Sequence, residues 1–95
     1  MAALIRVYGA TWCSDTKRAR QFLLAHGIKY EWFDVDEDPE ADAVVKQANP
    51  GKPNGVLPTI FFPDGSMLVE PSNEELAAKL GTGQGRSRTV RLDPP

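Results

Sequence analysis

The 95-residue sequence contains one cysteine and one histidine. A single thiol cannot form an internal disulfide, and these two side chains alone cannot fill a structural zinc site. No apolar run approaches the roughly 20 residues that a membrane-spanning helix needs, so we expect no membrane association. The start of the chain lacks the basic leader and apolar stretch of a secretion signal, which predicts a cytoplasmic protein.

The chain also lacks an excess of charge of either sign, with a net charge of −2. This balance provides no basic footprint for a nucleic acid. The length fits one domain, which we expect over residues 1–81 and in monomeric form. Residues 82–95 are rich in glycine and arginine and are predicted to be a flexible C-terminal tail, with docking to a partner as the alternative.

Apolar periodicity and turn residues predict seven elements. Strands are expected over residues 3–8, 29–35, 59–62 and 67–69, and helices are expected to begin near Ser14, at Pro39 and after Ser72. The order β-α-β-α-β-β-α is similar to that of the thioredoxin fold, an α/β architecture with a four-stranded mixed sheet flanked by three helices. Strands joined through a helix are expected to run parallel to their neighbours, and the closing hairpin antiparallel.

Cys13 stands at the corner between the first strand and the first helix. Unpaired N–H groups and the helix dipole favour an anion there, and the thiolate is the nucleophilic form of cysteine. Ser14 opens the helix, and Lys17 and Arg18 add positive potential one turn further on. Asp15 opposes them as a like charge beside a thiolate. We expect the helix and the two cations to prevail.

Two neighbours of the thiol carry further information. Trp12 is interpreted as an aromatic residue at the edge of the core, as a flat, half-exposed wall for substrate, or as both. Thr16 lies three residues after Cys13, one turn along the same helix face. A dithiol oxidoreductase would carry its second cysteine there; a threonine can donate a hydrogen bond to a thiolate but cannot attack a disulfide. Any mixed disulfide on Cys13 must therefore be resolved by an external thiol.

Two other segments are candidates for substrate binding. The first is Leu57-Pro58-Thr59, where we predict a cis bond before the proline, with the Leu57 backbone turned outward toward an extended substrate. The second is the start of the last helix, at Ser72 and Asn73, whose N–H groups can receive a carboxylate. A capping box formed by Ser72 and Glu75 explains the same residues without a ligand.

In their order and spacing these motifs resemble the glutaredoxin family, and within it the mycoredoxin-like branch. The resemblance covers about residues 3–81 and rests on Ala10-Thr11-Trp12-Cys13, Asp34-Val35-Asp36, Val56-Leu57-Pro58-Thr59, Asp64-Gly65-Ser66 and Pro71-Ser72-Asn73-Glu74-Glu75-Leu76. It implies thiol–disulfide exchange with a low-molecular-weight thiol, with Cys13 as the nucleophile. It also implies recognition through Leu57, through Thr59 and through the start of the last helix.

The sequence departs from the family at two places. Ser14-Asp15-Thr16 replaces the second half of a dithiol motif, and Glu70-Pro71-Ser72 replaces the glycine pair used to hold glutathione. We therefore expect no tightly bound cofactor and a co-substrate that is mycothiol, bacillithiol or glutathione, with S-thiolated proteins as clients. Two alternatives stay open: an iron–sulfur cluster carrier that uses Cys13 in a dimer, and a non-catalytic thioredoxin-fold adaptor.

Overall fold

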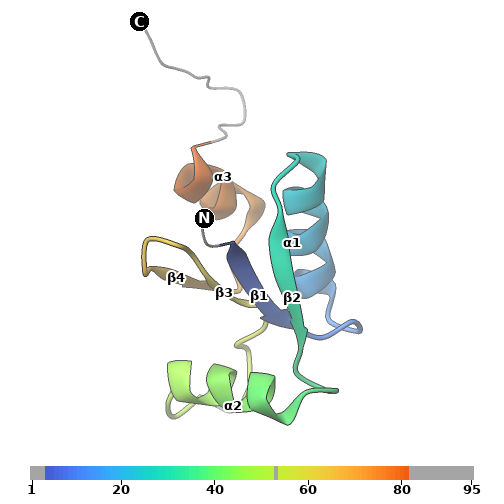
Figure 1. Ribbon diagram of the computed structural model, residues 1–95, viewed down its shortest axis with the longest axis vertical. Coiled ribbons are helices and arrows are strands. Elements are labelled where there is room, and N and C mark those ends of the chain that lie inside the picture. The colour runs from blue at the N-terminus through green and yellow to red at the C-terminus, as the bar shows by residue number, and fades with distance from the viewer. Residues whose placement is uncertain (1–3, 53, 82–95) are drawn as a thin grey trace, which may run out of the picture.

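The computed structural model describes residues 4–52 and 54–81 of the chain. Its elements follow the predicted order (Figure 1). They are β1 (Ile5–Gly9), α1 (Ser14–Ala25), β2 (Tyr30–Asp34), α2 (Pro39–Ala48), β3 (Thr59–Phe61), β4 (Met67–Val69) and α3 (Asn73–Leu80). The predicted tail over residues 82–95 lies outside the described residues, so the predicted division of the chain at residue 81 stays a prediction.

The starts of the second and third helices follow from local hydrogen bonding. The Asp38 side chain accepts a hydrogen bond from the Glu40 backbone N–H, with Pro39 at the first helical position, where a missing N–H costs nothing. Ser72 and Glu75 form the predicted capping box at the start of α3. A few neighbouring residues therefore determine where α2 and α3 begin.

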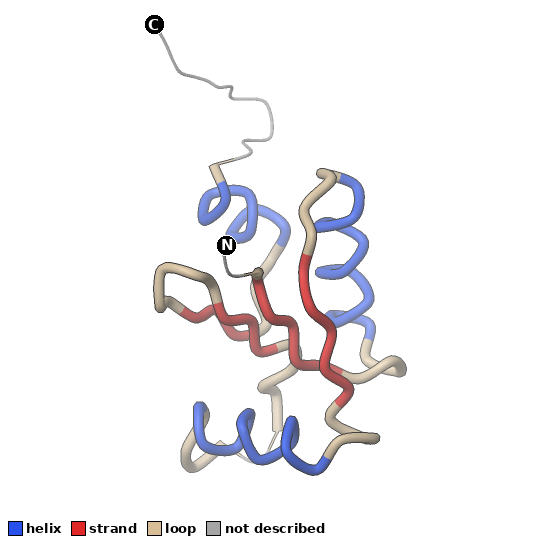
Figure 2. Tube along the Cα trace, in the orientation of Figure 1, coloured by secondary structure: helices blue, strands red, loops and turns tan. Residues whose placement is uncertain are grey.

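The four strands form one sheet in the order β2-β1-β3-β4 (Figure 2). Strands β1 and β2 are parallel, whereas β3 is antiparallel to both β1 and β4. The expectation that every strand reached through a helix runs parallel to its neighbour is therefore wrong for β3. The reason is that α2 lies across the end of the sheet, so β3 starts from the end at which β2 finishes (Figure 1).

The alternation of side chains along β1 divides the interior into two clusters. Ile5 and Val7 face the larger cluster, together with residues of α1 and α3. Tyr8 faces the opposite side of the sheet, where it packs with Ala41 and Val45 of α2. Helices α1 and α3 thus pack on one face, whereas α2 packs against the opposite face only near the end of β1.

The end of β1 and the first turn of α1 approach each other closely at Gly9 and Thr16. A Cβ placed on Gly9 would lie 2.6 Å from both Cγ2 and Oγ1 of Thr16, which is too close for a real side chain. Glycine at position 9 therefore allows α1 to sit directly against the central strand. This contact fixes the corner on which Cys13 lies.

Candidate active site

Cys13 is the N-cap residue of α1, with an extended backbone (φ −83°, ψ 121°). Its backbone N–H donates to Ala10 O at 3.1 Å, and its carbonyl accepts from the Lys17 N–H at 3.0 Å. The side chain makes no capping hydrogen bond, is half-buried, and places Sγ 3.9 Å from the Leu57 carbonyl oxygen. The thiol is therefore presented at the helix N-terminus, facing the loop that precedes β3.

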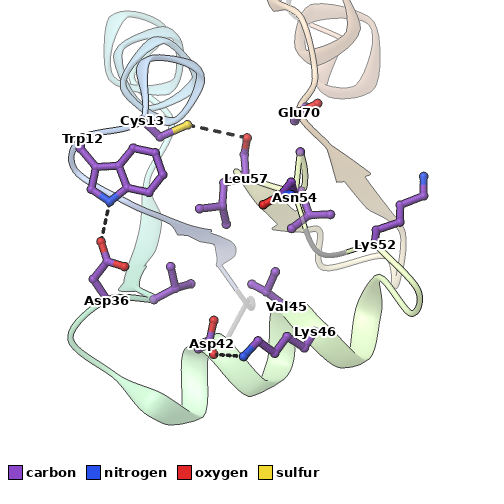
Figure 3. Close-up of a pocket in the computed structure, with 13 residues that line it drawn as sticks. Trp12, Cys13, Asp36, Asp42, Val45, Lys46, Lys52, Asn54, Leu57 and Glu70 are labelled. Carbon is purple, nitrogen blue, oxygen red and sulfur yellow. Dashed lines mark hydrogen bonds and ion pairs between the residues drawn. The ribbon is translucent and has the colours of Figure 1, made fainter.

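The thiol opens onto a groove of about 430 Å³ between the start of α1, the end of β2, α2 and the loop before β3 (Figure 3). The groove is lined by Trp12, Cys13, Val35, Asp36, Asp42, Val45, Lys46, Lys52, Asn54, Gly55, Val56, Leu57 and Glu70. Its lining combines apolar side chains with side chains that carry charges of both signs. A small polar molecule attached to the sulfur through a disulfide has space to lie in this groove.

Trp12 forms one wall of the groove. Its side chain is 68% exposed, and its indole Nε1 donates a hydrogen bond to Asp36 Oδ2 at 2.6 Å. This exposure favours the interpretation of Trp12 as a flat wall beside the sulfur over that of an aromatic residue at the core edge. Asp36 comes from the turn after β2, and sequence reasoning gave it no role at the site.

The charges around the first turn of α1 partly cancel. Arg18 Nη2 lies 3.0 Å from Asp15 Oδ1, so the carboxylate that opposes a thiolate is paired with one of the cations that favour it. Lys17 is exposed and lies on the surface that α1 shares with Arg20 and Gln21, outside the groove lining. Ser14 is exposed at the first position of α1.

Thr16 is fully buried, and its Oγ1 has no hydrogen-bond partner among residues 4–52 and 54–81. The predicted hydrogen bond from its hydroxyl to the sulfur is therefore not formed in this state. Its close packing against Gly9 explains why the side chain is directed toward β1. Thr16 occupies the position of a resolving thiol without being able to act as one.

The segment Leu57-Pro58-Thr59 lies opposite the thiol, and the bond between Leu57 and Pro58 is cis. Leu57 lines the groove, but Pro58 and Thr59 are fully buried. The expectation that Thr59 contacts substrate is therefore wrong for its side chain. The hydroxyl of Thr59 instead donates to the Val56 carbonyl and accepts from the Asn49 side chain.

Ser72 and Asn73 do not line the groove. The Ser72 hydroxyl accepts from the Glu75 N–H, and the Ser72 N–H donates to the Glu75 carboxylate. Asn73 Oδ1 accepts from Arg18 Nη1 at 3.3 Å, and the same nitrogen donates to the Pro71 carbonyl at 3.0 Å. At the start of α3 the structure therefore favours the capping interpretation over substrate binding.

Several groove residues carried no signal in the sequence. Val45 and Asp42 reach the groove from α2, and Asn54 reaches it from the loop after α2. Glu70 was expected only as a replacement for glycine; its φ of +49° puts a non-glycine residue in the left-handed region, and its carboxylate lies beside Gly55. Periodicity could not identify these residues, because the groove joins segments that only the tertiary fold brings together.

Across residues 4–52 and 54–81, no helix has the length and apolar character needed to cross a membrane. The same residues contain no group of three or more side chains suited to holding a metal ion.

Comparison with known proteins gives a consistent result. The sequence model of the glutaredoxin family matches residues 5–67. The chain is 35% identical over 80 residues to a candidate glutaredoxin of Mycobacterium tuberculosis, covering 84% of this chain and 93% of that protein. It is 33% identical over 76 residues to mycoredoxin 1 of Corynebacterium glutamicum, covering 80% of this chain and 91% of that protein.

Two crystal structures share the fold. A glutaredoxin from Archaeoglobus fulgidus superimposes with a TM-score of 0.65 at 21% identity, covering 82% of this chain and 86% of that one. A glutaredoxin from Methanosarcina mazei superimposes with a TM-score of 0.67 at 23% identity, covering 83% and 79%. At this level of identity the likeness establishes the thioredoxin fold.

Proposed function

Because this chain belongs to the glutaredoxin family, we propose that it is a monothiol oxidoreductase that reduces mixed disulfides between proteins and a low-molecular-weight thiol. One observation carries the proposal. Cys13 is the only cysteine of the chain, and the position one turn along its helix is filled by the buried Thr16. A catalytic cycle on this scaffold therefore needs a thiol from outside the protein.

The proposed cycle has two exchanges. In the first, the Cys13 thiolate attacks the small-thiol sulfur of the mixed disulfide, and the client leaves as a thiolate that takes up a proton. In the second, a free small-thiol thiolate attacks the disulfide on Cys13, releasing the oxidised small-thiol dimer and regenerating the Cys13 thiolate. Each turnover thus consumes the mixed disulfide and one free small-thiol molecule, and it yields one client thiol and one oxidised small-thiol dimer. The position of Cys13 at a helix N-terminus supports both steps, since it favours the thiolate as nucleophile and as leaving group.

The groove supports the choice of a small-thiol co-substrate. In the attack geometry the small-thiol half of the disulfide lies between Trp12 and the Leu57 backbone, and the client half points to solvent. Mycothiol, bacillithiol and glutathione are the three candidates. Glu70 at the groove, where family members that hold glutathione carry a glycine, supports the first two.

The test is to follow reduction of a mixed disulfide between 2-mercaptoethanol and each of the three thiols, with the matching thiol reductase present. We expect turnover with one of them and none in Cys13→Ser. Retained turnover in Cys13→Ser would overturn the mechanism. Absence of turnover with all three thiols would favour the cluster carrier or the adaptor, which the visible absorption of protein purified without oxygen would separate.

A further inference from the structure

Asn49 is a buried polar residue that the exchange chemistry does not use. It is the C-cap of α2 and is 8% exposed. Its Nδ2 donates to the Val45 carbonyl at 2.9 Å and to Thr59 Oγ1 at 3.2 Å. A buried amide needs such partners, and here both of its donors are used within the protein.

The hydrogen bonds continue from Asn49 to the groove. Thr59 Oγ1, which accepts from Asn49, donates to the Val56 carbonyl at 2.5 Å. Because the hydroxyl has a single proton, the bond from Asn49 leaves that proton free for Val56. The amide of Asn49 thus sets the direction of both hydrogen bonds, from Asn49 to Thr59 and from Thr59 to Val56.

Val56 and Leu57 are the residues that depend on this network. Both line the groove, and the Leu57 carbonyl lies 3.9 Å from Cys13 Sγ. Within the described part of the chain, segment 54–57 has two hydrogen bonds, one from Thr59 to Val56 and this long contact from the thiol. The bond from Thr59 is therefore the main polar restraint on the wall opposite the sulfur.

We propose that Asn49 is a positioning residue of the site: through Thr59 it fixes Val56 and Leu57 as the wall that receives the small-thiol half of the disulfide. This inference rests on the proposed function. It assigns Asn49 an effect on affinity for the mixed disulfide and not on the reactivity of Cys13, because Asn49 contacts α2 and β3 and is linked to the sulfur only through the long 3.9 Å contact with the Leu57 carbonyl.

The experiment compares Asn49→Leu and Thr59→Val with Thr59→Ser, which keeps the hydroxyl, and with Gln47→Ala, an exposed control in the same turn of α2. The substrate is the mixed disulfide of 2-mercaptoethanol with whichever small thiol supports turnover. We expect KM to rise roughly tenfold in Asn49→Leu and Thr59→Val with kcat kept, as for loss of binding that is equal in the ground and transition states. Thr59→Ser and Gln47→Ala should keep the wild-type KM, and all four should react with iodoacetamide at the wild-type rate.

Two results would overturn the inference: an unchanged KM in a folded Asn49→Leu or Thr59→Val, or a loss of iodoacetamide reactivity equal to the loss of turnover.

A second measurement, of backbone amide hydrogen exchange, does not depend on enzymatic turnover. The Glu70 amide donates at 2.9 Å to the carbonyl of Pro58, directly after Leu57, and so reports local opening of the backbone next to the wall. We expect its hydrogen exchange to quicken about tenfold in Asn49→Leu, with the amides of β1 unchanged. If the wild-type protein turns over none of the three disulfides, the proposed function fails while this exchange measurement still decides whether Asn49 holds the wall.

Discussion

The indole Nε1 of Trp12 and the carboxylate of Asp36, 24 residues apart in the chain, are joined by a 2.6 Å hydrogen bond at the rim of the groove. Trp12 precedes the thiol, and Asp36 belongs to the turn between β2 and α2. The bond holds an exposed aromatic ring in one orientation beside Cys13. It joins the segment before α1, which carries Cys13, to the turn between β2 and α2 on the other side of the groove.

Removal of this bond should weaken substrate binding. In Asp36→Ala the ring of Trp12 is free to leave the wall, so we expect KM for the mixed disulfide to rise about threefold, since an exposed hydrogen bond to a charged group contributes modestly. Asp36→Asn keeps an acceptor and serves as the matched control. Steady-state kinetics on the three proteins measures the effect; equal KM values would show that Trp12 holds its place without Asp36.

The ion pair between Asp15 and Arg18 should protect the reactivity of the thiol. In Arg18→Met the carboxylate of Asp15 is left unpaired two residues from Cys13, so we expect alkylation by iodoacetamide at pH 7 to slow by about threefold. The double variant Asp15→Asn/Arg18→Met removes both charges and should recover most of the wild-type rate. A double variant as slow as Arg18→Met would instead assign the effect to the contacts that Arg18 makes with Pro71 and Asn73.

The contact between Gly9 and Thr16 predicts a loss of stability. Gly9→Ala places a Cβ 2.6 Å from the Thr16 side chain, so we expect the free energy of unfolding to fall by about 1–3 kcal/mol, the usual range for overpacking. Adding Thr16→Ala removes both atoms involved and should reverse most of the loss introduced by Gly9→Ala. Urea denaturation of the two single variants and the double variant gives this comparison, and simple additivity would contradict a direct clash.

A second thiol at position 16 should convert the proposed monothiol mechanism into a dithiol mechanism. Thr16→Cys places a sulfur one helical turn from Cys13, where it can attack a mixed disulfide on that residue. We expect an oxidised variant with no free thiol by titration and a mass 2 Da lower than the reduced form, against one free thiol in the wild type. Thr16→Ser is the control. Two free thiols after oxidation would show that the buried position 16 cannot reach the sulfur.

The pH dependence of stability should include a contribution from Asp64. The hydrogen bond from Lys79, followed by those from Ser66, holds the pKa of this carboxyl well below its ordinary range. Because the folded pKa is lower than the unfolded one, the resulting stability is present above the ordinary range of a carboxyl and is lost as pH falls below it. Lys79→Met should therefore be less stable than wild type at pH 7, with the difference shrinking toward pH 2. Urea midpoints between these values provide the measurement, and a constant difference would rule out Asp64 as its source.

The sequence predicted the elements whose causes are local. The helix that begins at Pro39 and the capping box at Ser72 depend on neighbours within one turn, and both are in the structure. The position of Cys13 at a helix start could likewise be predicted, because a strand, a break and an amphipathic pattern surround it. The motifs then indicated the family, which the comparisons show.

What could not be predicted depends on how separate segments pack. The direction of β3 follows from the angle of α2 to the sheet, which no local pattern encodes. The family resemblance implied recognition through Thr59, but this side chain is buried in the structure, where its hydroxyl accepts a hydrogen bond from Asn49. The ion pair between Arg18 and Asp15 could not be predicted either, because the side-chain conformation of Arg18 depends on its contacts with Pro71 and Asn73 of a distant segment.

The two halves of the site belong to different sides of the sheet. Cys13 is carried by α1, which packs on the larger cluster, whereas the wall at Val56 and Leu57 is tied to α2 and packs on the smaller one. Under the proposed function, substitutions on the α2 side would therefore change which small thiol is accepted while the sulfur keeps its reactivity. Selection of the co-substrate would then be open to change from α2, at a distance from the helix that presents the nucleophile.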